Sequence, residues 1–435
     1  MATEKFPTTA AVKPAVLHHL DKAMEVIWLT AVALVPLAVL PDEIVVVGFE
    51  APKIFLLRTA AIVLGLLTIV RWWLAWASLN GIGDVSGEAR RLLGWTSHSQ
   101  GRFVGFGAFA VLAVVTLATV LSPVPHVSTW GVDIGLDTTA LANTAAYLVL
   151  FGVMVVRLRG RPAIDRLLWI LVVSATVVAL VGIGQALLGY AGDGPQRIGI
   201  KSTIGNPVFL GSYFAITIPV TFGLVLSARF RWAGLPDWSV GAFVLLPQVV
   251  AVGLTGTRGS LLSLALSIPL IVVLLAWVGG KPAVKAAGLV LTPLVVVAAL
   301  GLAIGATSPA GSDLARIMGR YLQLPSELGQ LTGSAADRTK IWEQSWDVFL
   351  HPRWPDSEEY LEIPALLVEP IRPLIGYGPE VFRYAYLQSV AEDSAGLTFH
   401  AHSFVLHTAV ELGVLGVVGY GGLVLAVAWL LLRLV

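Results

Sequence analysis

The chain has 435 residues, of which 56% are hydrophobic and only 13% charged, and its formal net charge at pH 7 is +1. A soluble domain carries about 25% charged residues. A chain this apolar would expose too much hydrophobic surface to water, so the bilayer is its expected solvent. The small net charge gives no basic stripe for nucleic acid. The absence of cysteine excludes disulfides, thiolate metal sites and cysteine nucleophiles.

Ten stretches are apolar enough for transmembrane helices, which need about 20 residues each. The first follows a polar amino terminus and lacks a small-x-small cleavage pattern, so we interpret it as an uncleaved span. A polar segment far longer than any other connection separates the last two. The ten stretches are residues 23–40, 54–76, 103–121, 139–156, 166–189, 207–228, 239–255, 259–279, 283–306 and 410–432.

The expected fold is therefore an all-α polytopic membrane protein with about ten transmembrane helices and one long, partly helical extracytoplasmic loop. Residues 1–306 are expected to form nine helices with short connections. Residues 307–409 form the loop, and residues 410–435 the tenth helix.

The distribution of Lys and Arg predicts the orientation, because cytoplasmic loops carry an excess of both. A cytoplasmic amino terminus places most of them inside, whereas the outside segment 122–138 has none. The long loop is then extracytoplasmic. The inside cations are Arg90, Arg91, Arg102, Arg157, Arg159, Arg161, Arg166, Arg229, Arg231, Lys281, Lys285 and Arg433.

Four cations lie at span boundaries on the outside face, which should be poor in them: Lys53, Arg197, Lys201 and Arg258. Any one of them is explained equally well by snorkelling to lipid headgroups. Four together favour a site for an anionic ligand, because an arginine at the membrane surface is costly unless it snorkels or pairs.

The first of four chemically informative segments is Arg197-Ile-Gly-Ile-Lys-Ser-Thr-Ile-Gly-Asn-Pro207. Its glycines permit close backbone approach, and Asn206 with Pro207 can cap and start a helix. Arg197 and Lys201 can face a phosphate near that helix amino terminus. A glycine-rich loop before a helix is common, so the segment alone is a weak signal.

The second segment, residues 254–260, is a tight turn between two spans that contains Thr-Arg-Gly. Arg258 carries a planar, permanently charged group that suits phosphate oxygens. The alternative is an arginine that only caps a helix.

The third segment lies in the long loop and combines a helical pattern, residues 337–349, with a later Gly-Tyr-Gly. Apolar residues recur at helical spacing and predict an amphipathic helix that ends before Pro352. For Trp342 and Trp346 we favour packing onto the membrane surface or the loop's own core. Arg338 is the member that can reach a ligand.

The fourth segment, residues 399–416, contains three histidines and Glu-Leu-Gly. Ser403 is a good N-cap, which predicts a helix from here to about Gly413. His402 then lies at the helix amino terminus, where the dipole disfavours the imidazolium and leaves a proton acceptor. A lone histidine is more often structural, but the outside face offers few other bases. The two-residue spacing of His400 and His402 is not a metal-binding pattern on a helix, so no metal is expected.

In this order the four segments resemble the O-antigen ligase and polymerase family of bacterial membrane glycosyltransferases, over nearly the whole chain. The similarity extends to Ser122-Pro-Val-Pro125 and to the Pro52-Lys53 start of the second span. Two features depart from the family. Ser403 stands where asparagine is usual, and the chain shows about ten spans rather than about twelve.

The resemblance implies transfer of a glycan from an undecaprenyl-diphosphate-linked donor to an acceptor hydroxyl on a lipid, glycan or protein. The reaction would be inverting, free of metal and cofactor, and located at the extracytoplasmic face of the bacterial plasma membrane, as in lipopolysaccharide biosynthesis. His402 would be the general base. The implied diphosphate-binding residues are Arg197, Arg258, Arg338, Lys53 and Lys201, and the supporting residues are Asn206, Ser403, His400 and Glu411.

Two other functions stay open at this point. A transporter of a small anion such as bicarbonate would need polar groups within the spans, for which Arg58 and Gln185 are the candidates. A non-catalytic membrane subunit of an envelope complex would use the long loop as a docking surface.

Overall fold

The computed structural model describes a chain whose regular elements, within the described residues, are all helices. The described residues are 14–40, 49–78, 101–131, 139–158, 160–189, 199–226, 237–307, 312–322, 334–352, 368–389, 398 and 400–434.

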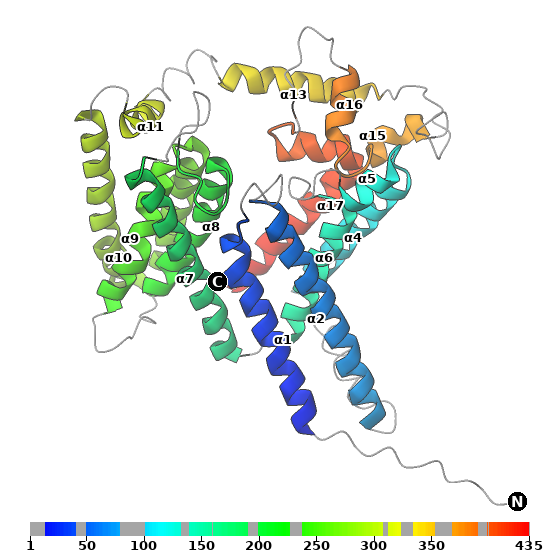
Figure 1. Ribbon diagram of the computed structural model, residues 1–435, viewed down its shortest axis with the longest axis horizontal. Coiled ribbons are helices and arrows are strands. Elements are labelled where there is room, and N and C mark those ends of the chain that lie inside the picture. The colour runs from blue at the N-terminus through cyan, green and yellow to red at the C-terminus, as the bar shows by residue number, and fades with distance from the viewer. Residues whose placement is uncertain are drawn as a thin grey trace, which may run out of the picture. The chain divides into compact units, whose positions relative to one another are not determined.

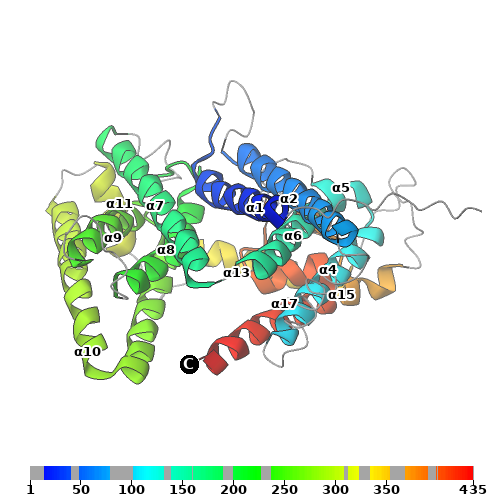
Figure 2. The ribbon, with the colours of Figure 1, turned by 90° about the horizontal axis from the view of Figure 1, so that it is seen from below.

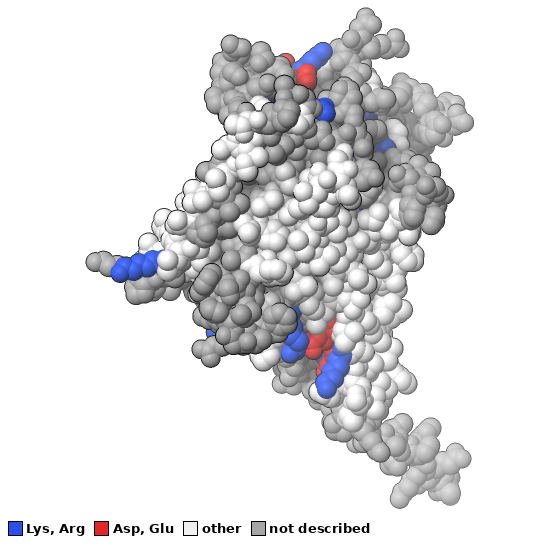
Figure 3. All heavy atoms as spheres, turned by 60° about the vertical axis from the view of Figure 1, so that its left-hand side comes forward, with Lys and Arg blue, Asp and Glu red and all other residues white. Residues whose placement is uncertain are grey.

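Six helices of this part of the chain are long and apolar enough to cross a membrane, which indicates an all-α, multi-pass membrane protein. They are Ala51–Leu74, Arg102–Val120, Gly160–Leu187, Pro207–Leu226, Arg258–Trp277 and Phe404–Arg433. Figure 3 shows a broad surface of uncharged residues, with the coloured charged residues at its margins. Such a surface suits contact with lipid.

The helix contacts divide the chain into two compact units, which we describe separately. The first comprises Met1–Trp28, Ile54–Arg159 and Thr332–Val435, and the second comprises Leu29–Lys53 and Gly160–Leu331.

In the first unit the longest helix is α17, which packs along α4 around Val111, Val115, Ala118 and Leu412. Figure 1 shows α13, α15 and α16 gathered at the end of the unit where α17 begins. The helices of this unit are α1 (Pro14–Leu34, as far as Trp28), α2 (Ala51–Ser78), α4 (Arg102–Val120), α5 (Pro125–Trp130), α6 (Leu141–Arg157), α13 (Ser334–Leu350), η2 (Glu369–Ile371), α15 (Arg372–Ile375), α16 (Phe382–Ser389) and α17 (Phe404–Leu434).

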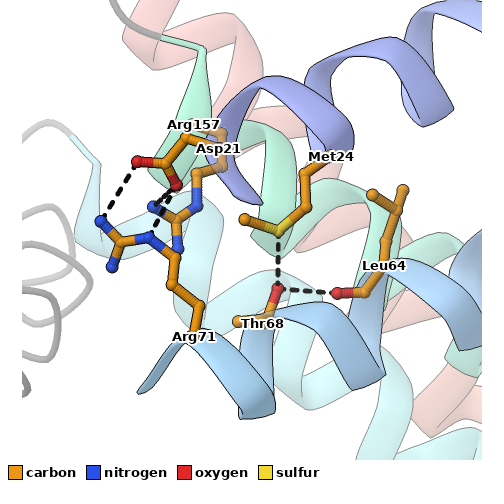
Figure 4. A network of polar contacts seen from close by, with 6 residues as sticks. All are labelled: Asp21, Met24, Leu64, Thr68, Arg71 and Arg157. Atoms are coloured by element: carbon orange, nitrogen blue, oxygen red, sulfur yellow. Dashed lines mark hydrogen bonds and ion pairs between the residues drawn. The ribbon is translucent and has the colours of Figure 1, made fainter. Parts of the chain in front are cut away.

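A charged cluster joins three helices of this unit (Figure 4). The Asp21 carboxylate of α1 accepts two hydrogen bonds from Arg71 of α2, at 2.7 and 3.2 Å. It accepts a third from Arg157 of α6, at 2.7 Å. Both arginines are buried against the helices, and the bidentate geometry of Arg71 makes its bond to the carboxylate strong. The cluster fixes the register of the three helices.

The second unit has a core of large apolar side chains that includes Leu210, Phe214, Phe222 and Leu245. A buried amide, Gln248, is satisfied within this core by hydroxyl and carbonyl oxygens of its neighbours. The elements are η1 (Val35–Leu37), α7 (Gly160–Leu187), α8 (Pro207–Leu226), α9 (Asp237–Leu254), α10 (Arg258–Thr307) and α11 (Asp313–Leu322).

One helical element, α10, covers both stretches 259–279 and 283–306 that the sequence predicts as separate spans. A straight helix of 50 residues would be about 75 Å long, more than twice the roughly 30 Å of a bilayer's hydrocarbon core. Figure 2 shows that α10 instead runs as two arms that meet at a bend. The sequence Gly279-Gly280-Lys281-Pro282, which disfavours a straight helix, lies between the two stretches.

Candidate functional site

The amino terminus of α17 presents the histidine that the sequence singles out. The helix begins at Phe404, as predicted, and the Ser403 hydroxyl accepts from the Leu406 amide at 3.5 Å. His402 precedes this cap with a left-handed backbone, φ 50°, and an exposed side chain. A positive φ is uncommon outside glycine and is found often at functional sites.

The pKa of His402 is lowered below its usual value. Partial burial is the largest cause, and the positive charges of Arg338 and of a protonated His407 add to it. The sequence predicts a neutral imidazole from the helix dipole, whereas the structure attributes the lowered pKa to desolvation and to neighbouring cations. Arg338 lies on α13 of the same unit, close enough to His402 for its charge to lower the pKa of the imidazole.

The helix α17 bends at Gly413, which has φ 63° and ψ −166°. The bend interrupts the helical hydrogen bonds near it. The Val410 carbonyl accepts a hydrogen bond from the Tyr377 amide at 3.0 Å, and the Glu411 carbonyl accepts one from the Gly378 amide at 2.8 Å. The Gly-Tyr-Gly turn is thus bonded to the bent helix by its backbone. Two motifs that are far apart in the sequence form one local structure.

Glycine is required at three positions of this junction. A Cβ at Gly376 would overlap the backbone of Glu411, and one at Gly413 would overlap the backbone at the end of α15. A Cβ at Gly378 would meet the hydroxyls of Ser122 and Ser128, which are hydrogen-bonded to each other at 2.9 Å. The Ser-Pro-Val-Pro segment therefore packs onto the same turn.

A buried arginine that the sequence analysis missed supports this turn. Arg372 donates from Nη1 to the carbonyls of Leu121 and Gly376, both at 3.0 Å, and lies over the Tyr377 ring at 5.3 Å. Burial lowers the pKa of Arg372 to about 10, against the opposing effects of Tyr377 and Glu369. It remains charged at neutral pH. The sequence held no signal for it, because its acceptors are backbone carbonyls.

Two buried carboxyl groups lie beside the bend. Glu411 is 2% exposed and Glu380 is 8% exposed, and both contact the Thr139 hydroxyl. His407 Nε2 lies 3.4 Å from Glu411 Oε1. The sequence analysis named Glu411 without a definite role, and it missed Glu380. The signal for Glu380 was its place directly after the Gly-Tyr-Gly-Pro turn.

In the second unit, the Gly-Asn-Pro loop lies against the Thr-Arg-Gly turn. The amide of Ile200 donates to the Leu254 carbonyl at 3.1 Å. Gly199 has φ 126°, and a Cβ there would overlap the Thr255 carbonyl. Asn206 caps α8, because its side-chain oxygen accepts from the Val208 amide at 2.8 Å. The capping role expected for Asn206 is confirmed.

The Lys53 side chain lies among backbone carbonyls of the second unit. Its ammonium donates to the carbonyls of Ala38 at 2.9 Å, Thr203 at 2.8 Å and Phe49. An ammonium has three protons, and each has an acceptor within the protein. Lys53 therefore bonds the end of η1 to the Gly-Asn-Pro loop, and we leave it out of the proposed diphosphate site.

Arg258 is the first residue of α10, and its Nε donates to the Arg320 carbonyl at 2.8 Å. The bond caps the carboxyl end of α11, so the alternative reading of Arg258 as a capping residue holds in part. Arg320 and Tyr321 were missed in the long loop. The Tyr321 hydroxyl donates to the Gly253 carbonyl at 2.8 Å, and burial raises the pKa of Tyr321 to about 12.

The amphipathic helix of the long loop is present as α13, which ends at Leu350, before Pro352 as predicted. Its inner face carries Ser345 and Val348, whereas Trp342 and Trp346 are 41% and 51% exposed. The two indoles therefore do not pack into the loop's core.

The predicted site residues fall in different parts of the structure. Lys201 and Arg258 belong to the second unit, whereas Arg338, His400, His402 and Glu411 belong to the first. Arg197 lies outside the described residues. A pocket shared by the cations and His402 stays a prediction.

The polar residues that a transporter would use have partners inside the protein. Arg58 donates to the Asn143 side chain at 2.8 Å and to the Trp130 carbonyl at 3.1 Å. Gln185 accepts from the Ser202 amide at 2.7 Å. Within the described ranges, no group of three or more His, Asp or Glu side chains could hold a metal ion.

Comparison with protein-family models, curated proteins and solved structures finds no match to this chain.

Proposed function

We propose that this protein is a bacterial membrane glycosyltransferase of the O-antigen ligase and polymerase type. It would transfer a glycan from an undecaprenyl-diphosphate-linked donor to an acceptor hydroxyl on a lipid, glycan or protein. The observation that carries the proposal is His402, an exposed histidine with a lowered pKa at the amino terminus of a membrane helix. Such an imidazole is neutral near pH 7 and can accept a proton.

The acceptor hydroxyl is a poor nucleophile until it loses its proton. In the proposed reaction His402 takes this proton while the acceptor oxygen bonds to the anomeric carbon of the donor. The bond from that carbon to the diphosphate breaks, and its electron pair leaves with the diphosphate. Attack opposite the leaving group inverts the anomeric centre. A positioned general base typically contributes about 10²–10⁴-fold to such a step.

Negative charge grows on the leaving diphosphate, so fixed cations that favour it lower the barrier. Arg258 is the leading candidate, because the bond from its Nε to α11 fixes the guanidinium. Arg197, Lys201 and Arg338 complete the proposed set. The packing of the Gly-Asn-Pro loop on the Thr-Arg-Gly turn supports a common location for Lys201 and Arg258.

The proposed topology has ten spans, a cytoplasmic amino terminus and the reaction at the extracytoplasmic face. The six apolar helices support part of this count, and two shorter apolar helices, Leu141–Arg157 and Phe243–Leu254, match two more expected spans.

The test is glycan transfer by the purified protein in proteoliposomes, with an undecaprenyl-diphosphate-linked glycan and a panel of acceptors. We expect His402→Ala to lower the transfer rate by at least about 100-fold while the protein still folds. His351→Ala is the matched control, because His351 is an exposed histidine at the end of α13 that pairs with Asp347. It should leave the rate unchanged.

Transfer by His402→Ala at the wild-type rate would exclude His402 as the base. If sealed vesicles took up labelled bicarbonate and no glycan were transferred, the anion transporter would replace the proposal.

A further inference from the structure

We propose that the exposed face of α13 binds the glycan chain of the donor, with sugar rings stacked on the indoles of Trp342 and Trp346. The assignment of this glycan to the donor rests on the proposed function. The binding of a sugar chain to α13 does not, and it can be measured in a protein that transfers nothing.

Four exposed side chains form a stripe along α13: Arg338, Trp342, Trp346 and Leu350. Each is four residues from the next, so they lie on successive turns of one helix face. Successive members are about 6 Å apart along the axis, and the whole stripe is about 18 Å long. Contiguous exposed apolar side chains mark interaction sites, whereas isolated ones are ordinary.

The packed face of α13 holds the stripe in place. Val348 is buried in a core cluster with side chains of α16 and α17, and Ile341 and Phe349 pack against the same cluster. The Phe349 ring lies 5.4 Å from the Trp346 ring, measured between centroids, at an interplanar angle of 37°. A surface that is ordered before binding loses little conformational entropy when a ligand arrives. The indoles therefore form a preorganised platform.

The composition of this face suits a sugar chain. A pyranose ring has a face of C–H bonds, which packs on an aromatic ring, and a rim of hydroxyl groups, which need polar partners. Glu343 is exposed and lies one residue after Trp342 and three before Trp346, so its carboxylate adjoins the platform. A carboxylate accepts hydrogen bonds from hydroxyl groups. Asp347 is paired with His351, and Glu343 is the carboxylate that we assign to the sugar.

A lipid surface is the other ligand that exposed indoles suit. A helix that lies on a membrane carries Lys and Arg along its polar face. In α13, three carboxylates, Asp337, Glu343 and Asp347, stand against two cations, Arg338 and Lys340. The charge of the helix therefore favours a hydroxyl-rich ligand over a bilayer surface.

Arg338 connects the stripe to the candidate base. It lies close enough to His402 for its charge to lower the pKa of the imidazole, and Trp342 follows it by about one helical turn. With the diphosphate at Arg338 and the reacting sugar at His402, the next sugars of the chain meet Trp342 and Trp346. The platform then holds the distal part of the glycan, away from the bond that breaks.

Donors of different length test this assignment in proteoliposomes. The double variant Trp342→Leu, Trp346→Leu keeps two apolar side chains but removes both aromatic faces. For an undecaprenyl-diphosphate-linked donor with a long glycan, we expect its KM to rise at least about fivefold. Its kcat should not change, because contacts that are equal in the ground state and the transition state affect only KM. For a donor with a single sugar, KM should keep its wild-type value.

The control for this experiment is Trp73→Ala, which removes a tryptophan of α2 that is 61% exposed and should change neither KM. An unchanged KM of the double variant for the long donor would overturn the proposal. An equal rise for both donors would overturn it too, because the indoles would then have only a structural role.

Sugar binding is measured separately from transfer. We expect the purified wild-type protein to bind diphosphate-free fragments of bacterial polysaccharides on a glycan array, and the double variant not to bind them. Trp346→Cys, in a chain without other cysteines, should react with a membrane-impermeant maleimide in proteoliposomes, and a bound fragment should slow the reaction.

Binding by a protein that transfers no glycan would leave the sugar site in place and remove the proposed function. Absence of binding in the wild type would overturn the sugar site. A Trp346→Cys that lipid shields from the maleimide would also overturn it, and would assign the exposed face of α13 to the membrane.

Discussion

His402 shows how a residue's surroundings set its chemistry. The side chain is exposed enough to meet a substrate, yet partial burial and the charge of Arg338 lower its pKa. A base of this kind stays neutral to a lower pH than a free histidine does. Transfer should therefore persist on acidification and fall only as the pH passes below the lowered pKa.

The contribution of Arg338 can be measured separately. Arg338→Gln removes a positive charge that disfavours the imidazolium, so the pKa of His402 should rise. The acidic limb of the pH–rate profile should then move to higher pH, whatever happens to the maximal rate. Lys340→Gln, which removes an exposed cation from the same helix, is the control. An acidic limb that does not move in Arg338→Gln would show that the arginine has no electrostatic effect on the base.

Single residues were predicted well where the local sequence decides their role. Asn206 and Ser403 are caps, which depend on the few residues that follow them. Lys53 was assigned to a phosphate because its charge and position suit one, but its ammonium is saturated by three carbonyls. Those carbonyls lie up to 150 residues away, so only folding reveals them.

At the scale of elements, the bend in α17 joins the Gly-Tyr-Gly turn to Glu411. The sequence predicts a helix that ends near Gly413, because glycine often ends helices. In the structure the helix bends there and continues to Leu434. The bend leaves the carbonyls of Val410 and Glu411 free to bond the Gly-Tyr-Gly turn. The role of Gly413 therefore depends on a turn that precedes it by more than thirty residues.

Gly413→Ala should destabilise the protein strongly. Alanine disfavours φ 63°, and its Cβ would overlap the backbone of α15, so we expect a loss of at least about 2 kcal/mol. Gly421→Ala is the control in the same helix, because a Cβ there meets nothing within 4 Å and should be neutral or stabilise by up to about 1 kcal/mol. Thermal unfolding in detergent measures both. Equal melting temperatures for the two variants would mean that the bend is not required.

For the whole molecule, the excess of Lys and Arg on alternate connections predicts a cytoplasmic amino terminus and an extracytoplasmic long loop. The absence of cysteine makes this testable without background labelling. A membrane-impermeant maleimide applied to intact cells should label Trp342→Cys, which lies on the exposed face of α13. Arg161→Cys, exposed at the start of α7, should react only after permeabilisation. The reverse pattern would invert the topology and place His402 in the cytoplasm.

The sequence by itself determined the membrane character, the all-helical class and the positions of several helices. These follow from composition, apolar runs and capping residues, all of which act over one or two helical turns. Only the tertiary structure decided that Lys53 is saturated, that Arg372 supports the Gly-Tyr-Gly turn and that Glu380 and Glu411 meet at Thr139. Such contacts join residues that are far apart in the chain, and a backbone carbonyl, which every residue has, leaves no mark in the sequence.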